Sequence, residues 1–304
     1  MKKRVMILKP CEDGEHGLFI EQLKTLKYSL TTQCMYTFCL NYFNRYLKGR
    51  NITGHIRVTK QVMLDYIQNM RNSGFADASV EIYFRPVRLF FGFLEERQKV
   101  FVNPAAGIQI KTPKLLPSVA SEEEMNLMIT APDTRKPVGV RDRAFMELLY
   151  STGMRRQEII QLDLTDLNMQ EATVRVLGKG DRERLLPIGK NAMRWLQEYI
   201  SKARPVLLEE SESRALWVKH GGGRINYECV QSIVALSRKR AGMKRKIVCH
   251  DFRRAFATHM LQHGAHPVDI QQLLGHVDLS HLRNYLRLTV ADLKKMHSES
   301  RVGE

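Results

Sequence analysis

A proline-containing segment divides the chain into two parts with different sequence patterns. Residues 103–118 have no helical period and include three prolines: Pro104, Pro113 and Pro117. Prolines without a periodic apolar pattern are typical of a connecting segment. A chain of 304 residues is also long enough for two domains with cores of their own. We therefore expect one domain over residues 1–102, a linker over residues 103–118, and a second domain over residues 119–304.

The first domain is predicted to contain about four helices. Apolar residues recur at helical spacing in four stretches: Gly17–Tyr28, Thr32–Leu47, Thr59–Met70 and Ala78–Glu96. Thr59 is of the residue type that caps helix N-termini, whereas Pro86 lies inside the last stretch and predicts a kink or break there. The aromatic residues fall on the apolar period, which places them in a core rather than on a base-stacking surface.

The second domain is predicted to combine helices with one small antiparallel sheet. Its first helix begins at Ser121–Glu124, whose Ser-x-x-Glu pattern has the form of a capping box. Alternating polar and apolar residues predict two strands, Ala172–Leu177 and Arg184–Ile188, joined by a Gly-Lys-Gly-Asp turn. Helical patterns occupy Arg141–Tyr150 before the strands and His250–Leu261 after them. The predicted fold class is mainly α, with a small antiparallel sheet that makes the C-terminal domain α+β.

The charge balance favours a polyanionic partner. The chain has a net charge of +16 and a pI near 9.7. Such values are the electrostatic footprint of nucleic-acid binding, although charge alone also suits an ordinary solvated surface. No stretch is apolar enough to span a membrane, and the opening MKKRVMILKP has too short an apolar run for a signal peptide. We expect a cytoplasmic protein with no membrane partner.

The cysteines and histidines do not indicate a metal site. The five cysteines are scattered and odd in number: Cys11, Cys34, Cys39, Cys229 and Cys249. Cys34 and Cys39 form one pair without a second ligand pair, and no HExxH pattern accompanies the histidines. We expect reduced thiols, no metal and no cofactor.

Six residues of the second domain have the chemistry that phosphoryl transfer without a metal requires. Five can be cations or donate hydrogen bonds to an anion, and the sixth is a phenol: Arg155, Lys179, His250, Arg253, His276 and Tyr285. Donors around a phosphate stabilise its charge while one oxygen attacks. Each has an ordinary alternative when taken singly: a surface arginine, a hairpin that only touches phosphates, a structural histidine or a packing tyrosine.

Local helix geometry is expected to place three of these residues. Gly153 suits the left-handed conformation that ends a helix, and Arg155 then starts a short helix that runs to Leu162. Free backbone amides and the helix dipole favour an anion at such a start. His250 and Arg253 are three residues apart, so they share one face of their helix.

The order of these residues and the phrases around them resemble the tyrosine recombinase family of the phage-integrase type, and most of all its Xer-like bacterial members. The similarity rests on TGMRRQE, GKGDRERLLPI, HDFRRAFATHM and LLGHVDLS, and on Tyr285 lying nine residues after His276. It is strong over residues 121–304. The N-terminal part resembles the family only in length, helical pattern and charge.

The resemblance implies a role for each of the six residues. Tyr285 would attack a scissile phosphate and form a 3′-phosphotyrosine link. Lys179 would be the general acid that protonates the leaving 5′ oxygen, and His250 would assist proton transfer. The phosphate would be held by three residues: Arg155, Arg253 and His276. Two such strand exchanges through a Holliday junction would complete recombination by four protomers.

Further residues are assigned by the same resemblance. Glu158 matches the family's acidic position and is expected to orient a neighbouring group, while Arg254 stands where the family more usually has histidine. DNA contacts are expected from six basic residues: Arg45, Lys48, Arg85, Arg88, Arg182 and Arg254. The N-terminal helices would form a SAM-like core-binding domain, which clamps the duplex together with the catalytic domain.

The expected partners are double-stranded DNA recombination sites, further copies of the chain and accessory proteins. An apolar stripe at helical spacing over Val290–Met296 suits docking on the same protomer or on a neighbour. The resemblance implies a C-terminal helix that packs in trans and links protomers in the tetramer on DNA. The implied location is the bacterial cytoplasm, at the nucleoid. Two alternatives remain open: a DNA-binding accessory protein of the same fold that does not cut, and a type IB topoisomerase-like relaxing enzyme. The sequence does not distinguish service to a phage, a transposon, an integron or the chromosome.

Overall fold

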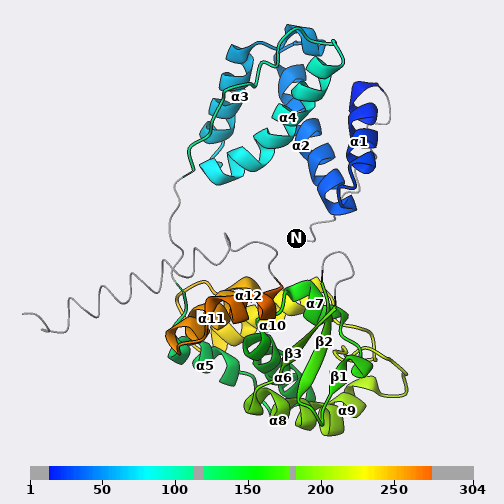
Figure 1. Cartoon of the computed structure of the whole chain (residues 1–304), viewed down its shortest axis with the longest axis vertical. Coiled ribbons are helices and arrows are strands. Elements are labelled where there is room, and N and C mark those ends of the chain that lie inside the picture. Colours follow the sequence, from blue (N-terminus) through cyan, green and yellow to red (C-terminus); the bar gives the residue numbers. More distant parts are fainter. Residues whose placement is uncertain (1–13, 113–118, 179–182, 276–304) are drawn as a thin grey trace, which may run out of the picture. The chain divides into compact units, whose positions relative to one another are not determined.

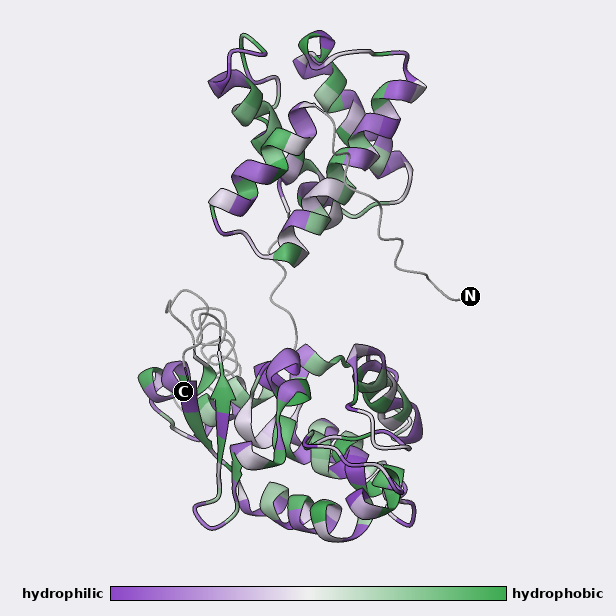
Figure 2. Ribbon diagram, turned by 90° about the vertical axis from the view of Figure 1, so that its right-hand side faces the viewer, coloured by the Kyte–Doolittle hydropathy of each residue, from purple (hydrophilic) through white to green (hydrophobic). Residues whose placement is uncertain are grey.

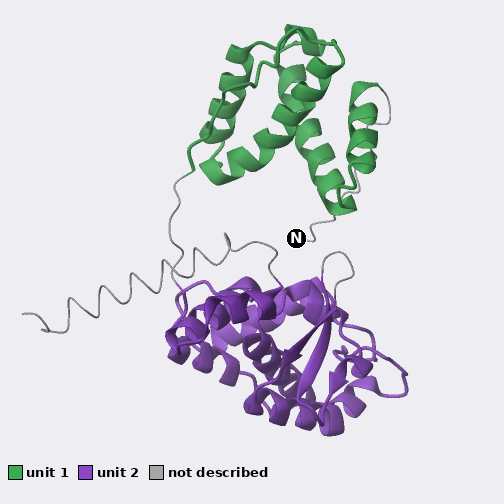
Figure 3. Ribbon diagram, in the orientation of Figure 1, with its two compact units in different colours: residues 1–115 green, residues 116–304 purple. Residues whose placement is uncertain are grey.

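The computed structural model describes residues 14–112, 119–178 and 183–275 of the chain. It forms two compact units, residues 1–115 and residues 116–304 (Figure 3). Helices dominate both units, and the sheet of the described residues has three short antiparallel strands (Figure 1). The predicted fold class, mainly α with a small antiparallel sheet, is confirmed.

Over its described residues, 14–112, the first unit has four helices and one 3₁₀ turn. They are α1 (Glu15–Thr25), α2 (Leu30–Gly49), the turn η1 (His55–Arg57), α3 (Lys60–Asn72) and α4 (Asp77–Glu96). All four helices fall on the stretches predicted from apolar spacing. Thr59 caps α3 as predicted, because its hydroxyl accepts a hydrogen bond from the Val62 N–H at 3.4 Å.

Aromatic side chains fill the core of the first unit. Five of the largest buried side chains are aromatic and come from α2, α3 and α4: Phe43, Tyr66, Phe84, Phe90 and Phe91. The rings of Phe43 and Tyr66 meet edge to face with centroids 4.9 Å apart. Each buried aromatic ring contributes roughly 1.5–3 kcal/mol to folding. The helices therefore alternate hydrophobic and hydrophilic residues along their length (Figure 2).

Helix α4 continues through Pro86, so of the kink or break predicted there the break does not occur. A proline inside a helix removes the hydrogen bond to the carbonyl four residues earlier, which is that of Ile82. The thiol of Cys39 on α2 lies 3.9 Å from this carbonyl and donates a weak hydrogen bond to it. Pro86 itself is buried among the apolar residues of α4. Packing against α2 therefore holds the helix together where local sequence predicts an interruption.

The chain after α4 packs back onto the first unit. Ala105 and Ile108, within the segment predicted as a linker, are buried in the aromatic core. The guanidinium of Arg88 donates to the Ile108 carbonyl at 3.0 Å, and the Asn103 side-chain amide donates to the Arg88 carbonyl at 3.2 Å. The first half of this segment is thus part of the first unit.

The second unit begins with helices α5 (Glu122–Thr130), α6 (Pro137–Thr152) and α7 (Arg156–Gln161), a 3₁₀ turn η2 (Leu164–Asp166), and strands β1 (Leu167–Asn168), β2 (Thr173–Leu177) and β3 (Glu183–Pro187). It continues with α8 (Lys190–Glu198), a π-helical turn η3 (Tyr199–Ala203), α9 (Arg204–Leu208), α10 (Tyr227–Arg240), α11 (Cys249–Gln262) and α12 (Pro267–Leu274). The capping box predicted at Ser121 is confirmed.

The sheet has the order β1-β2-β3 and one buried face. Val174 pairs with Leu186 across β2 and β3, and both side chains are buried. The neighbouring pair, Arg175 and Leu185, faces outward, because successive strand residues point to opposite faces. β2 and β3 were predicted from this alternation, whereas the two-residue β1 was not. Figure 1 shows α7 and α12 at the same end of the sheet.

Helix α6 forms the centre of the second unit. Eleven of its residues are buried, and it packs against α5, α8, α11 and the π-helical turn η3. Phe145 on α6 meets the buried ring of Trp217 with centroids 5.3 Å apart. The C-terminal end of α6 is therefore held rigidly, and the residues that follow it begin the candidate site.

Candidate active site

Arg155 is held at the junction between α6 and α7. Gly153 ends α6 in the left-handed conformation, with φ of 59°, as predicted. A Cβ atom at Gly153 would lie 2.3 Å from Cδ1 of Phe256, so this turn requires glycine. Arg155 follows as the N-cap residue of α7, and its side chain is 43% exposed. The turn thus presents a guanidinium at the surface from a rigid backbone.

Glu158 fixes both the backbone and the side chain of Arg155. Its Oε2 accepts from the Arg155 backbone N–H at 2.7 Å, and its Oε1 accepts from Nη1 at 3.0 Å. Arg184 on β3 donates to the same two oxygens at 2.7 and 3.1 Å. Burial acts to raise the pKa of Glu158, but hydrogen bonds from Arg184 and Arg155 outweigh it and hold the pKa below its ordinary value. The carboxylate is therefore ionised between two arginines.

Arg253 is a buried cation that joins three helices. It lies on α11 and is 2% exposed. Its Nη1 donates to the Gly153 carbonyl at 2.9 Å, and its Nη2 donates to the Leu274 carbonyl at 2.6 Å. A buried charge is costly without hydrogen bonds, and carbonyls at helix C-termini carry the partial negative charge that suits it. Arg253 therefore ties the ends of α6 and α12 together.

Three arginines converge on the C-terminal end of α12. The last three carbonyls before residue 276 each accept from a different guanidinium: Leu273 from Arg184 at 3.0 Å, Leu274 from Arg253 at 2.6 Å, and Gly275 from Arg155 at 3.4 Å, a long contact. These carbonyls have no partners within the helix. Gly275 ends α12 in the left-handed conformation. The arrangement fixes the point from which the chain continues to residue 276.

His250 lies in the first turn of α11 and reaches the surface. Partial desolvation, with the cations of Arg253, Arg254 and Arg155, lowers the pKa of His250 below its ordinary value. The imidazole is therefore neutral at neutral pH and able to accept a proton. Arg155, His250 and Arg253, distant in sequence, thus share one electrostatic environment.

The other predicted catalytic residues, Lys179, His276 and Tyr285, lie outside the described residues, as does Arg182. Two described elements lead directly to them. Lys179 and Arg182 belong to the connection between β2 and β3, and His276 follows Gly275 at the end of α12.

Arg184 lies next to both the β2–β3 connection and the end of α12, and it was not predicted as a site residue. Its partners lie 26 and 89 residues away, so no local pattern could have identified it.

The predicted DNA-contacting residues have different environments. Arg45, Lys48 and Arg85 are exposed on the first unit. Arg88 is half-buried and pairs with Glu81 at 3.2 Å, while Arg254 pairs with Asp251 at 2.9 Å. The contacts of Arg88 favour a role in holding the chain after α4, because its guanidinium also bonds to that segment.

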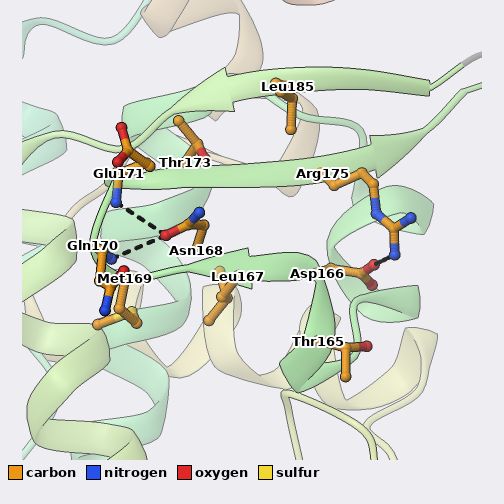
Figure 4. A pocket seen from close by; sticks show the side chains of 10 residues that line it. All are labelled: Thr165, Asp166, Leu167, Asn168, Met169, Gln170, Glu171, Thr173, Arg175 and Leu185. Carbon is orange, nitrogen blue, oxygen red and sulfur yellow. Dashed lines mark hydrogen bonds and ion pairs between the residues drawn. The ribbon is translucent and has the colours of Figure 1, made fainter.

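Other kinds of site find little support in the part of the chain that the structure describes. Residues 14–112, 119–178 and 183–275 contain no cluster of three His, Cys, Asp or Glu side chains arranged for a metal. Among the same residues, no helix has the length and apolarity needed to cross a membrane. A hollow of about 690 Å³ lies on the outer face of the sheet (Figure 4), and its lining contains none of Arg155, His250 and Arg253.

Comparisons with known proteins point to one family. Residues 119–291 match the phage integrase family. The chain is 32% identical to tyrosine recombinase XerD of Listeria innocua over 293 residues, which are 95% of this chain and 97% of the relative. It is 35% identical to tyrosine recombinase XerC of Pelotomaculum thermopropionicum over 250 residues, 80% and 81% of the two chains.

Solved structures show the same fold. The structure of XerH site-specific recombinase bound to palindromic difH substrate, a post-cleavage complex, matches with a TM-score of 0.75 at 20% identity, over 92% of this chain and 84% of that one. A lambda integrase (75–356) dimer bound to a COC′ core site matches with a TM-score of 0.73 at 15% identity, over 89% and 93% of the two chains.

Proposed function

The chain belongs to the phage integrase family and is a site-specific tyrosine recombinase that acts on DNA, and from this premise we propose which of its residues perform strand cleavage and rejoining. The observation that carries the assignment is the convergence of Arg155 and Arg253 on the end of α12. Two guanidinium groups, the partly exposed one of Arg155 and the buried one of Arg253, lie with His250 at the point where the chain leads to His276.

In this proposal these three cationic or proton-accepting side chains form the site for the scissile phosphate. Arg155 and Arg253 would neutralise its non-bridging oxygens, and Arg155 offers the planar fork that pairs well with phosphate. His276 would complete the phosphate site. Because Arg155 and Arg253 are held by hydrogen bonds to Glu158, Gly153 and the end of α12, they would stabilise the charge of the transition state with little reorganisation.

Tyr285 would supply the attacking oxygen. Its attack on phosphorus breaks the bond to the 5′ oxygen and forms a 3′-phosphotyrosine link. The leaving oxygen takes a proton from Lys179, and the neutral His250 accepts the proton that the Tyr285 hydroxyl loses. The covalent link retains the energy of the phosphodiester bond, so the reverse attack by a 5′ hydroxyl rejoins the strand.

The remaining parts of the proposal concern assembly. The first unit would contact the duplex through exposed cations such as Arg45, Lys48 and Arg85 and would act with the second unit as a clamp. Four protomers, linked through residues 290–296, would exchange two pairs of strands, with accessory proteins as further partners. A DNA substrate of this kind implies action in the bacterial cytoplasm, at the nucleoid.

The test uses the duplex that the protein selects from a randomised DNA pool, prepared with a nick so that cleavage traps the covalent intermediate. Wild-type protein should form a protein–DNA adduct, and Tyr285→Phe should bind the duplex and form none. Tyr227→Phe is the matched control, since Tyr227 is an exposed tyrosine of the same unit, and it should form adducts normally. Adducts with Tyr285→Phe would assign the nucleophile to another residue. Holliday junctions from two intact duplexes, rather than relaxed plasmid alone, distinguish recombination from relaxation.

A further inference from the structure

The guanidinium of Arg184 donates three hydrogen bonds, two to a carboxylate and one to a backbone carbonyl. Arg184 lies on β3 opposite Val176 of β2, and its side chain is 14% exposed. Its Nη1 and Nη2 donate to the two oxygens of Glu158 at 3.1 and 2.7 Å, and its Nε donates to the Leu273 carbonyl at 3.0 Å. The bidentate pairing has the geometry of a strong arginine–carboxylate interaction. Arg184 therefore links the β2–β3 pair to α7 and to the end of α12.

Glu158 is shared between Arg184 and Arg155. The Glu158 side chain is 7% exposed, and its Oε1 accepts from both guanidinium groups. Two cations and one carboxylate leave the cluster with one net positive charge. With Arg155 as its only cationic partner, the same carboxylate would cancel the charge that a phosphate needs. A buried carboxylate also demands compensation, because an unpaired buried charge is strongly unfavourable.

Arg184 also packs against the turn that precedes residue 276. A Cβ atom at Gly275 would lie 3.2 Å from Nη1 of Arg184, so the guanidinium is in close contact with this turn. Together with the Nε bond to Leu273, this contact sets the position of the α12 end relative to Arg155.

We propose that Arg184 is a positioning residue for strand cleavage, which neutralises Glu158 so that Arg155 remains available to the scissile phosphate. This role rests on the proposed function, because it assumes that Arg155 binds the phosphate. Without Arg184, Glu158 would take Arg155 into a bidentate pair. Lysine is not an equivalent replacement, since its single ammonium cannot bond to both carboxylate oxygens and to Leu273 in a fixed plane.

The experiment measures single-turnover adduct formation on the nicked selected duplex, together with the Kd for that duplex. Arg184→Met should cleave roughly 10- to 100-fold more slowly than wild type, the range that corresponds to losing one charged hydrogen bond in the transition state. Its Kd should change much less. The decisive variant is Arg184→Met combined with Glu158→Gln, which should cleave faster than Arg184→Met because the competing carboxylate is gone.

The control is Arg175→Met, an arginine on the neighbouring strand β2 that pairs with Asp166 at 3.0 Å on the outer face of the sheet (Figure 4). It should cleave like wild type. Fluorescence of Trp195 and Trp217, both in the second unit, shows whether each variant is folded at the assay temperature. If Arg184→Met does not fold, Arg184→Lys replaces it, with and without Glu158→Gln, and the same acceleration is expected.

The outcomes separate this inference from the proposed function. Wild-type protein that forms no adduct would overturn the proposed function itself. If wild-type protein cleaves but the double variant is as slow as or slower than the single Arg184 variant, the positioning role alone is overturned. A purely structural role predicts that the second substitution slows cleavage further. Faster cleavage by the double variant than by the single Arg184 variant supports the positioning role.

Discussion

The guanidinium of Arg253 donates a hydrogen bond to the Gly153 carbonyl over 2.9 Å, across 100 residues of sequence. Gly153 begins the turn that places Arg155, so the two arginines proposed to bind phosphate are positioned through one backbone group. The same turn lies under the ring of Phe256 on α11. The geometry of the site therefore depends on close packing between α6 and α11 as much as on the charged groups themselves.

Gly153→Ala should destabilise the second unit. The new methyl group would overlap the Phe256 ring at 2.3 Å, and φ is 59°, where L-residues are strained. Backbone strain and overpacking together should cost about 2–4 kcal/mol in the free energy of unfolding. Urea denaturation followed by tryptophan fluorescence measures this, because both tryptophans, Trp195 and Trp217, lie in the second unit.

Gly242→Ala is the matched control for this prediction. Gly242 has φ of 67°, but a Cβ atom there would meet nothing within 4 Å. Only the backbone strain remains, so the cost should be about 1–2 kcal/mol. Equal destabilisation by both substitutions would show that contact with Phe256 is unimportant.

Local signals predicted the framework of the site because they act over a few residues. Gly153 was assigned as a helix end from a glycine after an apolar run, and Ser121 as a capping box from its spacing to Glu124. Each depends on backbone hydrogen bonds within one turn. A kink or break at Pro86 was predicted by the same local reasoning, and the break does not occur, because a compensating donor, Cys39, comes from another helix.

The network behind the site could not be predicted from local patterns. In the sequence Arg184 has the pattern of an ordinary strand residue. Its hydrogen bonds to Glu158 and Leu273 exist only because the fold brings β3, α7 and α12 together. The same holds for the burial of Arg253, which sequence reasoning placed on a helix face without its carbonyl partners. Charge and helical spacing identify candidate cations, but tertiary packing decides which of them neutralise a carboxylate or a helix end.

The second unit should lose stability as the pH falls below about 6.5, because His259 is buried as a neutral imidazole. Its Nε2 donates to the Ala120 carbonyl at 3.0 Å, which leaves Nδ1 to accept from the Tyr150 hydroxyl at 2.7 Å. Burial lowers the pKa of His259 below its ordinary value of 6.5, and His263 adds to this, while Glu122 opposes it. The unfolded chain therefore takes up the proton first, and stability decreases from pH 6.5 down to the folded-state pKa.

Tryptophan-monitored urea denaturation between pH 5 and 8 checks the contribution of His259. The difference in unfolding free energy between wild type and His259→Gln should vary with pH in the window below about 6.5 and be constant above it. A difference that is the same at every pH would show that His259 does not titrate differently in the folded and unfolded chains.

Lys179→Ala should impair the departure of the 5′ oxygen more than DNA binding. A duplex with sulfur at the 5′-bridging position has a leaving group that needs little protonation. The variant should therefore cleave the normal nicked duplex about 100-fold or more slowly than wild type and recover most of that loss on the sulfur duplex. Arg184→Met should show no such recovery, since its defect concerns the phosphate site. Equal losses on both duplexes would assign Lys179 to binding.

The two units should bind DNA weakly when separate and tightly when joined. The first unit displays exposed cations, among them Arg45, Lys48 and Arg85, and the second unit carries the proposed phosphate site. Linking two weak sites raises the local concentration of the second, so the whole chain should bind about 100-fold or more tightly than either part. Its affinity should also fall more steeply with salt, because more phosphates are neutralised in the joined complex. Titrations of residues 1–112, residues 113–304 and the whole chain across a salt series measure both effects. A first unit with no affinity for DNA at low salt would contradict the clamp and assign it to protein contacts instead.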